Sequence, residues 1–280
     1  MKYFKYTLLL GFSFFLSCQK IETKKTYYDT GELHSEISLN SEGERDGEML
    51  IYYKNGNVKD KANYKNGKAI DTIYGYNEDG SLDNIEYYLE DSTYNILYKN
   101  NRIYRRGAFT KSDKNNGWIE TYDTNTGKLL MKSYLMEIFD KKLHSNTLIE
   151  YDAKGDTIKD KSVFFKLIVP DTVQVGQYNE GSIVFNSNKT EENKRKDKTL
   201  VIITGEGINK DFSNLSKIKL DSFKDRNRFA FKFTKKGKQV LRGKFLESLI
   251  IAKENSKNVE KVDVTVFDRD FYFEKEVYVK

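Results

Sequence analysis

YKNGNVKDKANYKNGKAIDTIYGYNEDGSL, residues 53–82, is the stretch around which this chain is organised. It contains a short pattern: a tyrosine, two or three polar residues, a glycine, one further residue, and then leucine or valine. The pattern occurs at Tyr28–Leu33, Tyr53–Val58, Tyr76–Leu82, Tyr122–Leu129 and, one residue looser, Tyr151–Ile158. Recurrence at a near-constant spacing indicates a repeat architecture.

The turn glycines of these copies are Gly31, Gly56, Gly80, Gly127 and Gly155. They lie 25, 24, 47 and 28 positions apart. The interval of 47 is close to two periods and predicts a hidden copy. Tyr98-Lys-Asn-Asn101-Arg-Ile103 supplies it, with Asn101 in the glycine position, because asparagine tolerates left-handed backbone well.

Each period is predicted to hold two short strands and two turns. Asp-Thr-Gly31 and Lys-Asn-Gly56 are typical of hairpin loops that need a positive φ at glycine. A second turn, Lys65-Asn66-Gly67-Lys68, lies between two main ones. Glycine and asparagine are too frequent here for helices, so the pattern predicts an all-β antiparallel meander that grows one hairpin at a time.

These residues resemble the MORN-like repeats, in the variant found in bacterial antitoxin-type repeat proteins. Tyr52-Tyr53-Lys-Asn-Gly56-Asn-Val58 fits one half of that motif, and Asn66-Gly67-Lys68 and Gly117-Trp118-Ile-Glu-Thr-Tyr122 fit parts of the other. Two departures are Asp71-Thr72, which stands where glycine is usual, and Asn101. The resemblance covers residues 27–160 and implies a scaffold without enzymatic activity.

Residues 1–17 have the features of a secretory signal peptide. Lys2 and Lys5 precede a short apolar run, which is too short for a membrane-spanning helix. The run ends in Phe15-Leu16-Ser17-Cys18, which resembles the bacterial lipobox, and Cys18 is the only cysteine in the chain. We therefore expect lipidation at Cys18, with residues 18–26 as a polar tether.

Acyl chains on Cys18 would hold the protein at a membrane. Each buried methylene contributes about 0.8 kcal/mol, so two or more chains anchor firmly where one is marginal. The expected location is the cell envelope, at the outer membrane, and the arrangement resembles Bacteroidetes surface lipoproteins. The expected partners are this membrane and an unidentified envelope protein or glycan.

Beyond residue 160 the repeat pattern stops. Residues 161–280 contain about seven short strand-like segments, which predict an immunoglobulin-like β-sandwich without a disulfide. Phe229, Phe231 and Phe233 alternate and should share its core face. Turns are predicted at Tyr178–Gly181 and Asp268–Asp270, and a polar loop at Asn186–Lys198.

Catalytic and metal-binding signals are weak throughout. His34 and His144 are 110 positions apart, and no nucleophile motif accompanies them. Asp268-Arg269-Asp270 offers two carboxylates, too few for Ca²⁺. Lys194–Lys198 and Lys235–Lys238 lack interleaved aromatic residues, so solvated loops are favoured over nucleic-acid binding. We expect no enzyme activity, cofactor, metal or nucleic-acid partner.

Three functions remain open: a protein-interaction scaffold, a glycan-binding module, and an immunity or antitoxin role implied by the repeat resemblance alone. A single-layer sheet exposes at least one face, and tyrosine and tryptophan combine contact area with a polar tip. The candidate binding residues are Tyr52, Tyr74, Tyr76, Tyr87, Tyr88 and Trp118.

Overall fold

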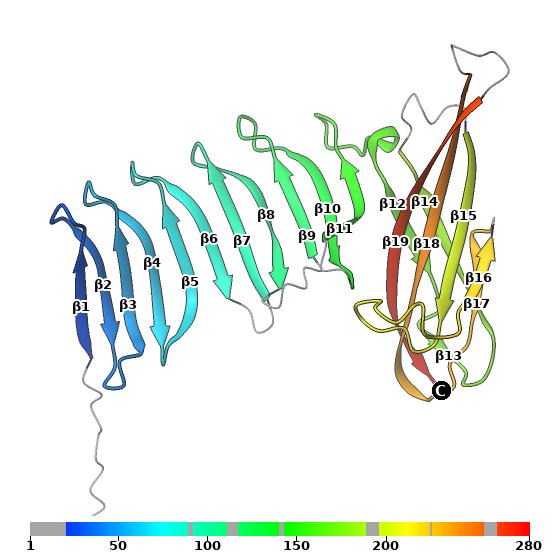
Figure 1. Cartoon of the computed structure of the whole chain (residues 1–280), viewed down its shortest axis with the longest axis horizontal. Helices are drawn as coiled ribbons and strands as arrows, with labels where there is room; N and C mark the ends of the chain where they lie inside the picture. Colours follow the sequence, from blue (N-terminus) through cyan, green and yellow to red (C-terminus); the bar gives the residue numbers. More distant parts are fainter. Residues whose placement is uncertain are drawn as a thin grey trace, which may run out of the picture. The chain divides into compact units, whose positions relative to one another are not determined.

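The computed structural model describes residues 21–88, 92–110, 117–139, 143–188, 196–224, 226–254 and 262–280 (Figure 1). These residues form β-strands and one 3-10 helix, η1 at Lys159–Lys161, and no α-helix occurs among them. They fall into two compact units, one ending at Ser81 and one beginning at Leu82. The all-β class predicted from the sequence is confirmed.

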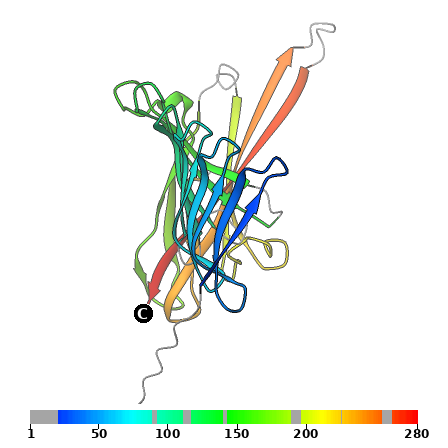
Figure 2. The same cartoon turned by 90° about the vertical axis from the view of Figure 1, so that its left-hand side faces the viewer.

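The first unit holds five antiparallel strands. They are β1 (Glu22–Tyr27), β2 (Leu33–Leu39), β3 (Arg45–Tyr52), β4 (Val58–Lys65) and β5 (Lys68–Tyr76). β1, drawn in blue in Figure 2, is the edge strand. Met49 and Ala62 pair directly across β3 and β4, and both are buried, so one face of these strands carries a small apolar core.

The second unit begins with the remaining strands of the sheet. They are β6 (Leu82–Tyr88), β7 (Ser92–Lys99), β8 (Arg102–Thr110), β9 (Gly117–Tyr122), β10 (Leu129–Glu137) and β11 (Leu143–Glu150). Within each unit these strands lie side by side in the order of the chain. This is the antiparallel meander that the repeats predict.

The turns of one sheet end match the repeat pattern. φ is positive at Gly31, Gly56, Gly80, Gly127 and Gly155 and at Asn101, as a left-handed turn residue requires. The Asn101 copy differs in form, because Asn100 and Asn101 together make a two-residue turn between the paired residues Lys99 and Arg102. Asn66 and Gly67 form the same kind of turn at the other sheet end.

Glycine, rather than tyrosine, sets the register of the repeat. The N–H of Gly31, Gly56 and Gly80 bonds the carbonyls of Tyr28, Tyr53 and Asn77, three residues earlier in each case. Asn77 is thus the equivalent of Tyr28 and Tyr53, and Tyr76 stands one position earlier. Because successive strand residues point to opposite faces, the tyrosines of the sequence pattern do not form one stripe.

Side chains at the turns also bind the next repeat. The Tyr28 hydroxyl donates to the Tyr52 carbonyl at 2.7 Å, and the Tyr53 hydroxyl donates to the Tyr76 carbonyl at 2.8 Å. In the second unit, Lys128 donates to the Ala153 carbonyl at 2.7 Å. These bonds join residues 23 to 25 positions apart, which is one repeat period.

Two further sheets pack face to face after β11. One has the order β12 (Phe164–Ile168), β14 (Asn179–Asn186), β17 (Arg228–Phe231). The other has the order β13 (Thr172–Val173), β19 (Val262–Val279), β18 (Gly237–Glu254), β15 (Lys196–Gly205), β16 (Asp221–Lys224). The predicted boundary between residues 160 and 161 falls within η1, between β11 and β12, whereas the compact units divide between Ser81 and Leu82.

The core of this sandwich is aromatic. Phe229 and Phe231 of β17 and Phe245 and Phe271 of the facing sheet are all buried. Phe245 and Phe271 stack with their centroids 4.8 Å apart. Phe233 is buried as well, so the predicted core face of alternating phenylalanines is confirmed.

Two predicted turns are wrong. Asp268–Asp270 lies inside β19, which pairs with β18 over its full length, so local turn preference yields to continuous ladder pairing. Tyr178–Gly181 is no hairpin either: β14 begins at Asn179, and the preceding β13 pairs in parallel with β19.

Asn186 ends β14 and Lys196 begins β15, while residues 189–195 of the predicted loop lie outside the described residues, as do residues 1–17 and Cys18.

Candidate functional site

The strand register places four aromatic side chains in one line across the second unit. Tyr87 pairs with Tyr94, and Tyr94 pairs with Ala108. Gly107 pairs with Ile119, which sets Ala108 opposite Trp118, and Trp118 pairs with Tyr134. We call Tyr87, Tyr94, Trp118 and Tyr134 the aromatic row. Directly paired residues share a face, so the row lies on one side of the sheet.

The aromatic row consists of two contacting pairs separated by a small residue. The rings of Tyr87 and Tyr94 have centroids 6.5 Å apart, and those of Trp118 and Tyr134 are 5.3 Å apart. Ala108 lies between the pairs, so Tyr94 and Trp118 are two strands apart, about 10 Å. Ala108 thus has one aromatic pair on either side.

Exposure is uneven along the row. Trp118 is 46% exposed and Tyr87 is 38% exposed. Tyr134, at the other end, packs against a small core formed by Met136, Ile208, Phe212 and Tyr272. Tyr134 therefore anchors the row, while Trp118 and Tyr87 are accessible.

A charged cluster lies beside the row, two residues along the same strands. Arg106 Nε is 2.6 Å from Glu120 Oε2, and Lys132 Nζ is 2.7 Å from Glu120 Oε1. The Tyr122 hydroxyl donates to Glu120 Oε2 at 2.6 Å. Glu120 thus accepts three hydrogen bonds on a face where the aromatic row supplies apolar area.

These contacts fix the charge of Glu120. Burial raises the pKa of its carboxyl, but the hydrogen bonds from Lys132, Tyr122 and Arg106 outweigh burial and bring the pKa to about 2. Burial and the hydrogen bond to Glu120 raise the pKa of Tyr122 to about 12. The cluster therefore keeps one charge state across the physiological range, which suits recognition better than proton transfer.

The six candidate residues separate into groups. Tyr87 and Trp118 belong to the aromatic row, whereas Tyr88 follows Tyr87 in the strand and points to the other face. Tyr52, Tyr74 and Tyr76 belong to the first unit and are only partly exposed. The Tyr52 hydroxyl donates to Glu36 at 2.7 Å, so this side chain has a local structural role.

Sequence reasoning missed Tyr94, Tyr134 and the charged cluster. The only available signal was spacing: Glu120 lies 14 positions after Arg106 and 12 before Lys132, about half a repeat period. Half a repeat period corresponds to one strand and its turn, so residues separated by that distance lie opposite each other on adjacent strands. Bulges between β9 and β10 and between β7 and β8 shift that spacing, which hides the row from the sequence.

The two histidines lie in different compact units. His34 Nδ1 lies 3.3 Å from the Thr26 hydroxyl and belongs to the first unit. His144 belongs to the second, where its Nε2 contacts the Asp270 carbonyl. Within the described ranges, no cluster of three or more His, Cys, Asp or Glu side chains has a metal-binding arrangement.

No protein-family model matches the chain, and neither the curated proteins nor the solved structures contain a significant match. A search of the described residues for a helix that could cross a membrane, judged by length and apolarity, finds none.

Proposed function

We propose that this chain is a non-enzymatic, lipid-anchored protein of the cell envelope that binds another protein through the aromatic row. The aromatic row itself carries the proposal, because Trp118 and Tyr87 are exposed on one sheet face beside fixed charges. Exposed, rigid aromatic side chains are the residues that most often dominate binding energy at protein interfaces. The charged cluster beside the row would fix the orientation of the bound partner, through Glu120, Arg106 and Lys132.

The test is photocrosslinking from intact cells. A benzophenone amino acid at position 118 should yield a specific crosslinked protein, whereas the same group at position 278 should not. Tyr278 is the matched control, because it is 55% exposed and lies outside the aromatic row. Trp118→Ser and Tyr87→Ser should reduce capture of that partner about tenfold or more while changing the melting temperature little. If the variant that combines Trp118→Ser and Tyr87→Ser still captures the partner as well as the wild type does, the aromatic row is not the binding surface.

Glycan binding is the second candidate, and the placement of small Ala108 between two aromatic pairs favours it. The apolar face of a sugar ring stacks on aromatic rings, and Tyr94 and Trp118 lie about two strand spacings apart. The charged cluster could then bond ring hydroxyls. A glycan array probed with the wild type and with Trp118→Ser separates the candidates: hits that disappear with the substitution support glycan binding over a protein partner.

Anchoring is tested separately. Cys18 directly follows the apolar segment and is the only cysteine. Labelled palmitate should enter the wild type, and Cys18→Ala should take up none and remain unprocessed or soluble. A wild-type protein without label would remove the lipid anchor from the proposal.

A further inference from the structure

On one side of the sandwich, the terminal strands of its two sheets lie opposite each other across shared cavities. β17 ends the three-stranded sheet and β16 ends the five-stranded sheet, and among the described strands neither has a second neighbour. Both strands lie on the same side of the second unit in Figure 1. A sheet edge of this kind presents unpaired main-chain groups that can pair with another strand.

The hydrogen-bond pattern identifies which main-chain groups of β17 point outward. Ile183 N–H donates to the Asn227 carbonyl at 2.8 Å, and Gly176 N–H donates to the Phe233 carbonyl at 2.9 Å. In an antiparallel pair, bonded residues alternate, so Phe229 and Phe231 also direct their main-chain groups toward β14. Arg228, Ala230 and Lys232 therefore direct theirs away from the sheet.

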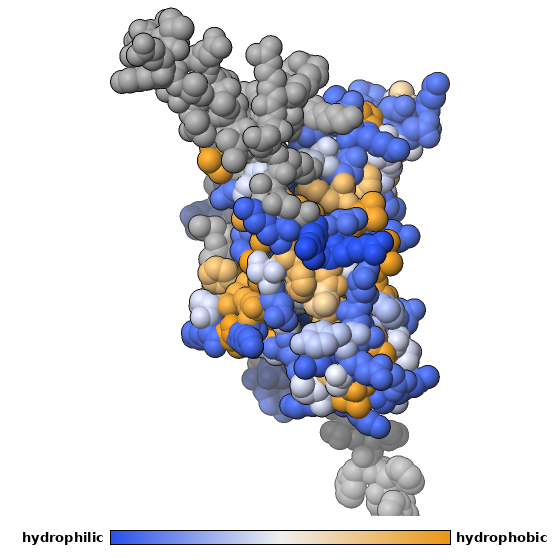
Figure 3. Space-filling model, turned by 90° about the vertical axis from the view of Figure 1, so that its right-hand side faces the viewer, coloured by the Kyte–Doolittle hydropathy of each residue, from blue (hydrophilic) through white to orange (hydrophobic). Residues whose placement is uncertain are grey.

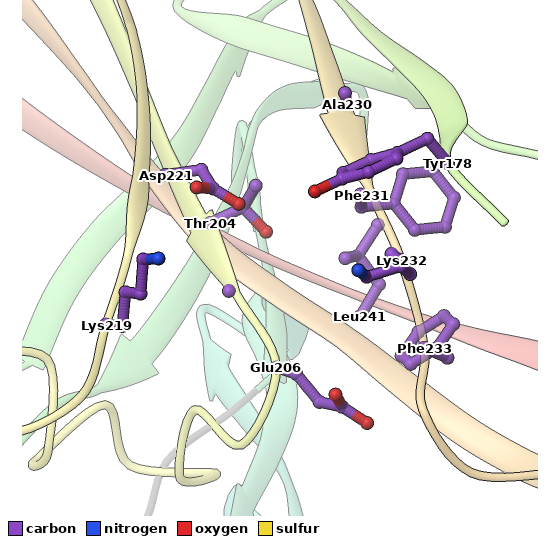
Figure 4. A pocket seen from close by; sticks show the side chains of 11 residues that line it. Tyr178, Thr204, Glu206, Lys219, Asp221, Ala230, Phe231, Lys232, Phe233 and Leu241 are labelled. Atoms are coloured by element: carbon purple, nitrogen blue, oxygen red, sulfur yellow. The ribbon is translucent and has the colours of Figure 1, made fainter. Parts of the chain in front are cut away.

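Two cavities lie beside this outward edge and share Tyr178 and Ala230. One has a volume of about 340 Å³ and reaches the buried side chains of Phe231 and Leu241. The other has a volume of about 580 Å³ and is lined by Phe223 and Phe229. Figure 4 shows Tyr178 and Lys232 on one side of the first cavity and Asp221 and Lys219 on the other. In Figure 3, apolar residues lie among polar ones on this side of the molecule.

The cavities have a basic surplus. Glu206 accepts hydrogen bonds from the N–H and hydroxyl of Thr234, and Glu180 pairs with Arg228 at 3.1 Å. The other charged lining residues are the basic Lys219, Arg226 and Lys232 and the acidic Asp221, so the two linings together carry four basic and three acidic side chains. Lys232 also lies over the Tyr178 ring, 4.8 Å from its centroid, so it is held at the opening.

We propose that the outward edge of β17 binds an extended acidic segment of a partner protein, which adds to the three-stranded sheet as a further strand. Its main chain pairs with the outward groups of Arg228, Ala230 and Lys232, which supplies affinity. Apolar side chains of the segment enter the two cavities, and its acidic side chains meet the lining residues Lys219, Arg226 and Lys232. Main-chain pairing with pockets for alternate side chains is an established mode of peptide recognition. This surface is separate from the aromatic row.

A second copy of this chain, pairing through its own β17, fits the outward edge poorly. In a symmetric antiparallel pair centred on Ala230, Arg228 of one copy would face Lys232 of the other. Like charges directly opposite each other destabilise a strand pair, and basic residues commonly protect edges against self-association. The same charges favour an acidic segment.

The test uses the full chain and fluorescein-labelled, capped octapeptides in which valine or isoleucine alternates with glutamate or aspartate. Binding is followed by fluorescence anisotropy. Ala230→Pro removes one outward N–H without removing a bond to β14, a position where edge strands accept proline. Ala230→Ser is the matched control that keeps the N–H. A peptide with N-methylated alternate residues tests the same bond from the ligand side.

Saturable binding should be weakened about tenfold by Ala230→Pro and by N-methylation, and left unchanged by Ala230→Ser. The double variant Lys219→Glu, Lys232→Glu should also weaken binding and should instead favour peptides with lysine in place of glutamate. The proposal is overturned if Ala230→Pro binds as the wild type does while keeping its melting temperature, if lysine peptides bind the wild type equally well, or if no acidic peptide in the set binds at about 1 mM.

Discussion

Asn146 and Tyr272 are joined by a two-point hydrogen bond between a side-chain amide and a strand backbone. Asn146 Oδ1 accepts from Tyr272 N–H at 2.7 Å, and Asn146 Nδ2 donates to the Tyr272 carbonyl at 2.7 Å. The register between β10 and β11 passes over Asn146, so it is the extra residue of a β-bulge. A bulge changes the direction in which a side chain points. Here it directs the Asn146 amide toward the main chain of β19, where the amide bonds both main-chain groups of Tyr272.

Asn146→Ala should destabilise the protein by about 2–4 kcal/mol, because Asn146 is buried and the change removes both hydrogen bonds between its amide and the main chain of Tyr272. Urea unfolding measures the loss. Ser145→Ala, at an exposed neighbouring position, is the control and should change stability by less than about 0.5 kcal/mol. Equal effects of the two substitutions would contradict the role assigned to the amide.

Gly56→Val should cost about 1–2 kcal/mol or more. φ of Gly56 is +85°, and a Cβ there would meet nothing within 4 Å, so backbone strain rather than collision causes the loss. Gly56→Asn should cost less, because asparagine tolerates positive φ. Asn101→Gly should be neutral or slightly stabilising in the same unfolding measurement. A neutral Gly56→Val would show that the turn does not require glycine.

Tyr53→Phe should destabilise the first unit by about 1 kcal/mol, because it removes the hydroxyl that donates to the Tyr76 carbonyl. Hydrogen exchange of the amides flanking the turn at Gly80 should become faster. Tyr64→Phe, whose hydroxyl only accepts an exposed bond from Arg45, is the comparison and should leave that turn unchanged. Unchanged exchange in Tyr53→Phe would mean that this bond does not couple adjacent repeats.

Glu120→Gln should destabilise the second unit at pH 7 by about 1–3 kcal/mol, through loss of charge-assisted hydrogen bonds from Arg106 and Lys132. The folded-state pKa of Glu120, about 2, is below its ordinary value of 4.5. Its ionised form therefore stabilises the fold above about pH 4.5, and this contribution is lost as the pH falls toward 2. Unfolding measured from pH 7 to pH 2 should show the wild type and Glu120→Gln converging; a constant difference would exclude this linkage.

Local chemistry made the repeat turns predictable. A positive φ is a property of one residue and its neighbours, so Gly31, Gly56 and Asn101 are identified by composition and spacing alone. Asp71 illustrates the same rule. It stands where the resembled repeats have glycine, and its φ is +68°. The aromatic row could be predicted only in part, because Tyr87 and Trp118 were visible as aromatic strand residues but their alignment was not.

Residue type and short-range alternation were enough to predict the all-β class, the positions of the turn residues and the buried face of Phe229, Phe231 and Phe233. They could not predict which residues became neighbours, because that depends on the folded chain. Pairing with β18 converted Asp268–Asp270 from a predicted turn into strand, and bulges aligned Trp118 with Tyr134 and turned Asn146 toward Tyr272. The physical reason is that a one-residue shift in register exchanges the two faces of a strand, and that shift is set by long-range hydrogen bonds and packing.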